Sequence, residues 1–358
     1  MIIGVCGFVA TGSSAVSDYL QEFEDVSVID NFEFQLSHAP DGLEDLDFQL
    51  NHHCAKYASS VVAIERFRRF FFNSVVYPNK DRSKNKALIG ACDKFIEAIS
   101  QVTWMGYGGV DNQLYCGRNY DKWLMNRFFP RVAWKAKKEI SHIRGKEIAG
   151  YPLHDMKFAL QPKEFDVYAK QLVMDVLSIL GVDFNKKIVL DQPFSGTNPC
   201  LGFPYFNDPR AIVVDRDPRD LFLFAKNFLR VKGAGYQMPV DVHEFVKYYR
   251  NQRECRFFDA HTKGVLSIHF EDLVYNYEET TQKIDEFCGL NPKNRKKKVF
   301  DPSISIRNTQ MAKRYPQDKE YVDYIEKMLP EYLYDFERFR DIDTSGSMFF
   351  GRALNKKQ

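Results

Sequence analysis

Short apolar runs alternate along this chain with longer segments whose apolar residues recur at helical spacing. Residues 2–6 and 211–214 are the most apolar runs, and both predict buried strands. Residues 26–29, 187–190 and 265–270 predict three further strands. Because short strands that alternate with helices form parallel sheets with crossover connections, the pattern predicts an α/β fold with helices flanking the sheet.

The longer segments predict helices, which we expect to pack with the strands in a single domain over residues 1–358. Residues 43–160 interrupt the alternation with a mostly helical pattern, rich in aromatic and basic residues, that predicts a helical insertion after the second strand. Residues 300–358 are expected to form a C-terminal loop and a last helix. The expected helices span residues 15–22, 61–73, 84–100, 120–143, 165–180, 218–230, 242–260, 277–288 and 319–339.

The composition is that of a globular chain, with 44% hydrophobic residues, 20 glycines and 15 prolines among 358 residues. A net charge of +2 gives no reason to expect binding to nucleic acid. No run of apolar residues is long enough to predict an integral membrane segment, which leaves only peripheral membrane contact open. The first residues lack the charged lead of a signal peptide.

Seven cysteines are spread widely, and none of them forms a C-x-x-C pair. An odd number at such spacing argues against both a disulfide framework and a zinc site. We therefore expect free thiols in a reducing compartment, and so a cytoplasmic protein.

The segment between the first strand and the first helix combines two glycines with a pair of serines. Backbone N–H groups of such a loop and the N-terminus of the following helix converge on an anion. The spacing matches the P-loop G-x-x-x-x-G-K-[ST], except that Ser13 replaces the lysine that kinases use on the β- and γ-phosphates. This predicts a P-loop-like phosphate site, with a glycine turn that only caps a helix as the alternative. The segment is Gly7-Phe8-Val9-Ala10-Thr11-Gly12-Ser13-Ser14.

A second polar loop, residues 215–220, follows the apolar strand 211–214. Arg216 and Arg219 leave the carboxyl end of this strand, the edge at which open α/β sheets bind ligands, and Pro218 is placed to open the next helix. Guanidinium forks match phosphate oxygens in a bidentate manner. The loop therefore predicts a second phosphate site, with an ion-pair cluster at a helix start as the alternative.

With these two loops the chain resembles the sulfotransferases that use 3′-phosphoadenosine-5′-phosphosulfate (PAPS), in a bacterial-type form. That family binds the 5′-phosphosulfate at a P-loop-like segment and the 3′-phosphate at an R-[DN]-P-x-[DE] loop. Further likeness lies in the family's Y-E-D-L strand, in the F-L-G-L end of the next helix and in a loop that closes over the nucleotide. The matching residues are 267–273, 278–290, 303–308 and 313–315, and the likeness covers residues 1–30 and 185–340.

The resemblance implies sulfuryl transfer from PAPS, as co-substrate and without a metal, to a hydroxyl or amine of a small-molecule or glycan acceptor. The insertion would then lie on the acceptor side. The first loop would hold the 5′-phosphosulfate and Arg216 the 3′-phosphate, while Arg219 would support Arg216 or face the acceptor. The implied binding residues are Gly7, Thr11, Gly12, Ser13, Ser14, Arg216, Arg219, Arg307 and Lys313.

Two positions depart from the family pattern. Ala10 stands where many members carry the lysine that stabilises the leaving group, and Phe224 stands where many carry a serine bound to the 3′-phosphate. Lys226 is a candidate to substitute in part. Either another cation takes over the role of the missing lysine, or the protein is a catalytically inert relic that keeps the nucleotide cleft.

Sulfuryl transfer also needs a group that takes the acceptor proton. Glu33 and then Asp30, which follow the second strand, are the preferred catalytic bases. Less favoured candidates are His38, His52 and His53. Gln192, Ser195 and Asn198 follow the expected strand 187–190, and Gln192 or Asn198 is a candidate for contact with the acceptor or the nucleotide, with turn residues that cap their own backbone as the alternative.

Together these features favour a sulfotransferase acting on a carbohydrate or glycolipid. Two alternatives stay open: a P-loop kinase of a small molecule, against which Ser13 argues, and the inert relic, which Ala10 and Phe224 favour. Basic residues interleaved with aromatic ones in residues 120–143 predict either an anionic glycan or lipid surface as partner, or a solvated face. The oligomeric state is not predicted.

Overall fold

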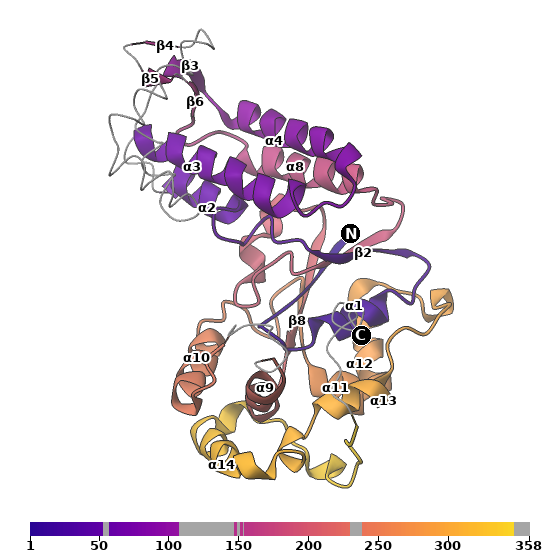
Figure 1. Cartoon of the computed structure of the whole chain (residues 1–358). Helices are drawn as coiled ribbons and strands as arrows, with labels where there is room; N and C mark the ends of the chain where they lie inside the picture. Colours follow the sequence, from indigo (N-terminus) through magenta and orange to yellow (C-terminus); the bar gives the residue numbers. More distant parts are fainter. Residues whose placement is uncertain (53–56, 107–146, 149–150, 153, 230–237, 347–358) are drawn as a thin grey trace. The chain divides into compact units, whose positions relative to one another are not determined.

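The computed structural model describes residues 1–52, 57–106, 147–148, 151–152, 154–229 and 238–346. The chain divides into two compact units. The first unit joins Met1–Gln35 to Val182–Gln358, and the second is Leu36–Gly181. The segment expected as a helical insertion, residues 43–160, falls wholly inside the second unit (Figure 1).

A five-stranded sheet forms the centre of the first unit. Every neighbouring pair of its strands is parallel, in the order β2-β7-β1-β8-β9. This confirms the predicted parallel sheet, because each of the five apolar runs is a strand of it. The strands are β1 (Ile2–Gly7), β2 (Val26–Glu33), β7 (Lys187–Asp191), β8 (Pro209–Asp215) and β9 (Val265–His269).

The strand order places a topological switch point between β1 and β8. From β1 the chain passes to β2 on one side of the sheet, whereas from β7 it crosses to β8 on the other side of β1. The loops that leave the carboxyl ends of β1 and β8 therefore diverge between two adjacent strands. In open α/β sheets this divergence opens the crevice in which ligands bind.

Helices flank the sheet, and they pack in two apolar clusters. One cluster joins one sheet face to α1, α11 and α12, through residues such as Val5, Val16 and Leu273. The other is formed by α9, α10 and α14, with Phe222, Phe245 and Ile325 at its centre. The helices of this unit are α1 (Ser13–Leu20), α9 (Pro218–Phe224), α10 (Val242–Glu254), α11 (Phe270–Tyr275), α12 (Tyr277–Cys288), α13 (Pro302–Ser305) and α14 (Lys319–Met328).

Three helices are shorter than the sequence predicts. The expected helix 242–260 is α10, which ends at Glu254. The expected helix 319–339 ends at Met328, because Pro330 disfavours helical geometry at Leu329 and supplies no N–H donor. The expected helix 218–230 is α9 followed by a π-helical turn at Ala225–Leu229.

Most of the described residues of the second unit are helical, as predicted, and the helices pack around phenylalanine rings such as Phe67, Phe95 and Phe165. A two-stranded antiparallel pair, β3 with β6, was not predicted. The expected helix 120–143 lies outside the described residues. The elements are α2 (Leu43–Asp47), the π-helix Phe48–His52, α3 (Tyr57–Phe71), the π-helix Phe72–Val76, α4 (Asn85–Ile99), β3 (Val102–Gly106), β4 (Glu147–Ile148), β5 (Tyr151–Pro152), β6 (His154–Phe158) and α8 (Phe165–Leu180).

Within the part of the chain that the structure describes, no helix combines the length and the apolar character needed to cross a membrane. In the same part, no group of three or more His, Cys, Asp or Glu side chains is placed to hold a metal ion.

Candidate functional site

The loop after β1, which we call the glycine loop (residues 7–14), needs glycine at two of its positions. A Cβ atom on Gly7 would lie 2.5 Å from Thr11 Oγ1 and 2.8 Å from the carbonyl oxygen of Val214. Gly12 has a φ of 98°, and a Cβ there would lie 2.5 Å from the ring of Phe270. Close packing, and not only turn geometry, therefore dictates these two residues.

Buried Thr11 closes the glycine loop. Its hydroxyl accepts a hydrogen bond from the N–H of Phe8 (3.1 Å) and donates one to the carbonyl of Phe8 (2.9 Å). Thr11 thus shapes the loop from inside, and its hydroxyl is already engaged.

The glycine loop presents a series of backbone donors. The N–H groups of Val9, Ala10, Gly12, Ser13 and Ser14 have no acceptor among the described residues. Three of them lie at the N-terminus of α1, where the helix dipole adds partial positive charge. The loop is therefore a cradle for an anion, built from backbone N–H groups and serine hydroxyls and containing no cationic side chain of its own.

Arg216, on the loop after β8, joins this second loop to the glycine loop. Its Nη1 donates to the carbonyl of Ala10 (3.1 Å) and its Nη2 donates to the carbonyl of Asn308 in the C-terminal part of the chain. The guanidinium also lies 4.9 Å from the ring centre of Phe224 and 5.3 Å from that of Phe270. Arg216 is only 3% exposed, so in this arrangement it holds three segments together.

Three buried carboxylates surround Arg216. Asp217 caps α9, Asp220 accepts hydrogen bonds from two backbone N–H groups of the C-terminal part, and Glu271 accepts the N–H of Asp217 (3.0 Å). Burial and the neighbouring Asp217 raise the pKa of Asp220 to about 7. Burial and the same neighbour also raise the pKa of Glu271 well above its usual range. The cluster thus carries less negative charge than three carboxylates formally would.

A second pair of arginines, Arg253 of α10 and Arg256 just beyond the end of that helix, braces the glycine loop. Burial alone would raise the pKa of Asp215, but the guanidinium groups of Arg253 and Arg256 hold it below its usual value. Arg253 donates to Asp215 (2.7 Å) and stacks on Phe8, 3.9 Å from the ring centre. Sequence reasoning missed both arginines, because both fall in the expected helix 242–260 and nothing local distinguishes them from surface arginines of an amphipathic helix.

The other cationic side chains predicted to bind the nucleotide differ in whether they already form hydrogen bonds or ion pairs within the protein. Arg219 bonds Asp217 (2.7 Å) and Glu326 (2.8 Å), so it supports the second loop. Lys313 donates to carbonyl groups of residues 340 and 342. The guanidinium of Arg307 has no hydrogen-bond partner within the described residues, and it is the predicted cation most available to a ligand.

A third loop, residues 192–198 after β7, lies against the glycine loop. Gln192 Nε2 donates to Ser13 Oγ (3.0 Å). A Cβ on Gly196 would lie 2.6 Å from the carbonyl oxygen of Gly7, so the two loops are in close backbone contact. Ser195 bonds Thr197 (2.8 Å) and shapes its own turn.

Asp191, the last residue of β7, is the functional candidate that sequence reasoning missed. It pairs with Val5 of β1, and it follows Val189 by two positions, so it lies on the sheet face that packs against α1. Its Oδ1 is buried and has no hydrogen-bond partner among the described residues. Burial, and then the charge of Glu33, raise the pKa of Asp191 to about 6. A polar residue ending the strand next to β1 was the signal that could have found it.

The predicted bases fall in different places. Glu33 is exposed at the end of β2, pairs in register with Asp191 and accepts a hydrogen bond from Gln35 (2.6 Å). Asp30 belongs to β2, but its side chain lies outside the described part of the structure. His38 and His52 belong to the second unit, and His53 lies outside the described residues.

The two departures from the family pattern each have a structural counterpart. Ala10 has a φ of 61°, a left-handed conformation that orients its carbonyl group toward Arg216. Phe224 is buried beneath the same guanidinium. Lys226 pairs with Asp318 (2.7 Å) and is therefore already engaged.

Comparison of the chain with family models, with curated proteins and with solved structures finds no match in any of the three.

Proposed function

We propose that this protein is a cytoplasmic PAPS-dependent sulfotransferase that transfers a sulfuryl group to a hydroxyl or amine, with a carbohydrate or glycolipid as the acceptor class. One observation carries the proposal: Arg216 Nη1 lies 3.1 Å from the carbonyl oxygen of Ala10. The P-loop-like glycine loop and the arginine loop therefore share one sheet edge at the switch point. A bisphosphorylated nucleotide needs two such anion sites near one another.

The charge of the glycine loop favours sulfuryl over phosphoryl transfer. A terminal phosphoryl group carries about two negative charges at neutral pH, and kinases meet it with a lysine and a metal ion. The sulfuryl group of PAPS carries a single charge. A cradle of backbone N–H groups and serine hydroxyls, which has Ser13 in place of that lysine, is suited to the smaller charge.

In the proposed reaction the acceptor oxygen or nitrogen attacks the sulfur atom in line with the bond to the 5′-phosphate oxygen. The new bond to sulfur forms while that bridging bond breaks, and 3′-phosphoadenosine-5′-phosphate leaves. The acceptor proton passes to Asp191, whose carboxylate forms no hydrogen bond within the described residues. Since its pKa is about 6, Asp191 is ionised at neutral pH and ready to accept this proton.

Binding roles follow from which donors are available. Gly12, Ser13 and Ser14 would hold the 5′-phosphosulfate with backbone N–H groups, and Arg307 offers an unengaged guanidinium for the 3′-phosphate. Arg216 could bind the 3′-phosphate directly only if one of its Nη atoms released its present acceptor, the carbonyl of Ala10 or of Asn308, and bonded a phosphate oxygen instead. That role stays a prediction.

Two measurements test the proposal in sequence. The first compares thermal stabilisation by 3′-phosphoadenosine-5′-phosphate with that by ATP and magnesium, and we expect the bisphosphate alone to stabilise the protein. Stabilisation by ATP only would favour the kinase instead. The second follows labelled sulfate from PAPS onto a panel of glycans and glycolipids, in the wild type and in Asp191→Asn.

We expect sulfate transfer by the wild type, and a reduction of about 10²–10⁴-fold in the variant, since general-base catalysis contributes that much. Bisphosphate binding without transfer to any acceptor would identify an inert nucleotide-binding protein. An Asp191→Asn variant as active as the wild type would leave the sulfotransferase proposal standing and would remove Asp191 from it.

A further inference from the structure

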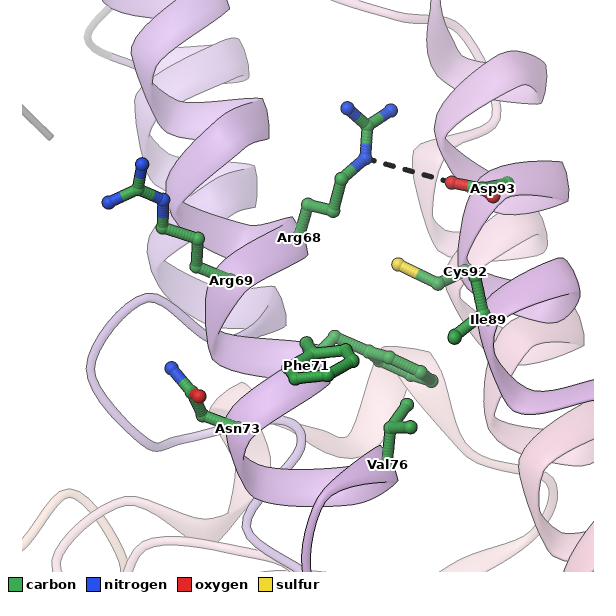
Figure 2. A pocket seen from close by; sticks show the side chains of 9 residues that line it. Arg68, Arg69, Phe71, Asn73, Val76, Ile89, Cys92 and Asp93 are labelled. Atoms are coloured by element: carbon green, nitrogen blue, oxygen red, sulfur yellow. Dashed lines mark ion pairs between the residues drawn. The ribbon is translucent and has the colours of Figure 1, made fainter. Parts of the chain in front are cut away.

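A pocket of about 290 Å³ lies within the second unit, between the end of α3 and helix α4. Buried Phe71, Val76 and Cys92 form its floor, and Figure 2 shows these side chains between the two helices. At its rim Phe72 is 48% exposed and Ile89 is 40% exposed. An apolar pocket whose rim leaves large side chains open to water has surface that a ligand would cover favourably.

The chain builds this pocket with an irregular turn. The α-helix α3 ends at Phe71 and continues as the π-helix Phe72–Val76, and this turn supplies Phe72, Asn73 and Val76 to the lining. Single π-helical turns joined to α-helices are rare and frequently mark functional sites.

Two arginines, Arg68 and Arg69, lie at the rim. Arg68 Nη1 bonds Glu65 (2.5 Å), and its Nε lies 3.6 Å from Asp93, as the dashed line in Figure 2 marks. That separation is too long for a hydrogen bond, and the buried Nε has no partner among the described residues. Asp93 itself is 57% exposed, so this second ion pair is weak.

We propose that this pocket binds a small amphiphile, with its apolar body between α3 and α4 and an anionic head, such as a carboxylate, at Arg68. The head would pair with the partly exposed guanidinium of Arg68, whose ion pair with the exposed Asp93 is weak. The apolar body would cover Phe72 and Ile89. The site belongs to the second unit and is independent of the proposed sulfotransfer.

The test is calorimetric titration of the full chain with decanoate and with decanol at low salt. Decanoate and decanol share an apolar tail and differ in head charge. We expect saturable binding of one decanoate per chain, at least about tenfold tighter than that of decanol (about 1.4 kcal/mol), because only the carboxylate can pair with Arg68.

A matched pair of variants examines the charge directly. Ile89→Glu and Ile89→Lys remove the same apolar side chain from the rim and add opposite charges, and the partly exposed site tolerates both. Decanoate should bind the glutamate variant at least about tenfold more weakly than the lysine variant. Ala98→Glu, which adds the same charge at an exposed position of α4 outside the lining, should bind decanoate like the wild type.

Three outcomes would overturn the proposal. One is the lack of saturable decanoate binding to the wild type. The second is equal affinity of the two Ile89 variants, or of decanoate and decanol, which would remove the anionic head. The third is a loss in Ala98→Glu as large as that in Ile89→Glu, which would place the effect outside the pocket.

Discussion

Replacement of Arg216 by methionine tests whether this side chain joins the two loops and neutralises the carboxylates around it. The change removes two hydrogen bonds from a charged donor to the carbonyl groups of Ala10 and Asn308, each worth about 1.5–3 kcal/mol. Methionine keeps part of the contact with the neighbouring phenylalanine rings. Breaking a buried ionic cluster by removing one partner costs about 3–5 kcal/mol. We expect a loss of that size in the free energy of unfolding at pH 8.5.

The loss should depend on pH, with a defined sign. The pKa of Asp220 is raised to about 7 and that of Glu271 well above its usual value, so the folded protein binds protons that the unfolded chain releases. The stability contributed by these groups is present at low pH and is lost as pH rises through the raised pKa values. Without Arg216 the pKa values of Asp220 and Glu271 rise further. If the two rises together amount to about one pKa unit, the methionine variant should lose about 1–2 kcal/mol less stability at pH 5.5 than at pH 8.5.

Urea unfolding of the wild type, Arg216→Met and Arg216→Lys at pH 5.5 and 8.5 measures these terms. Lysine keeps the positive charge but cannot donate to both carbonyl groups as a guanidinium does. The lysine variant should therefore be less stable than the wild type and yet have a similar pH dependence of stability. Equal losses at both pH values in the methionine variant would refute the electrostatic part of the reasoning. If the methionine variant lost less than about 1 kcal/mol in the free energy of unfolding, Arg216 would not hold the two loops together, because a surface contact alone contributes up to that much.

Further predictions concern the glycine loop and the proposed base. Gly12→Ala should destabilise the protein by at least about 2 kcal/mol more than Gly289→Ala in urea unfolding: both positions have positive φ, but only at Gly12 does a new Cβ meet the Phe270 ring. Equal losses would show that backbone strain alone accounts for the effect.

If the protein transfers sulfate, kcat/KM should rise with pH through about 6, as Asp191 ionises. Glu33→Gln should move this rise to lower pH, because it removes a negative charge that raises the pKa of Asp191; an unmoved profile would assign the titration to another group.

Arg216 shows why a phosphate-like motif and a structural joint are difficult to tell apart in this chain. Its position after β8 is typical of an arginine that binds a ligand. Its buried guanidinium also connects the loop after β8 with the glycine loop and with the C-terminal part of the chain. The two roles are compatible if a ligand replaces one carbonyl acceptor. The anion cradle of the glycine loop does not depend on that exchange, since its backbone donors are already available.

The features that the sequence predicted correctly are those that residues close together in the chain determine, such as helix bounds and strand positions. The helices α8 and α12 have the predicted bounds, because apolar spacing marks their faces and a glycine in the left-handed conformation follows each of them. The five strands and the position of both loops at strand ends follow from the same local signals. The glycine pair of the first loop was likewise visible from its spacing, although the contacts with Val214 and Phe270 that exclude a Cβ there come from the tertiary structure.

Only the tertiary structure decided which side chains are free and which are engaged. Whether Asp191 is buried beside Glu33 depends on the register of β7 with β1 and β2, and no local pattern encodes that register. The partners of Arg216 and of Arg253 come from distant parts of the chain. Hydrogen bonding and burial of a charge are set by contacts between segments far apart in sequence, so a motif can locate a functional group but not its state.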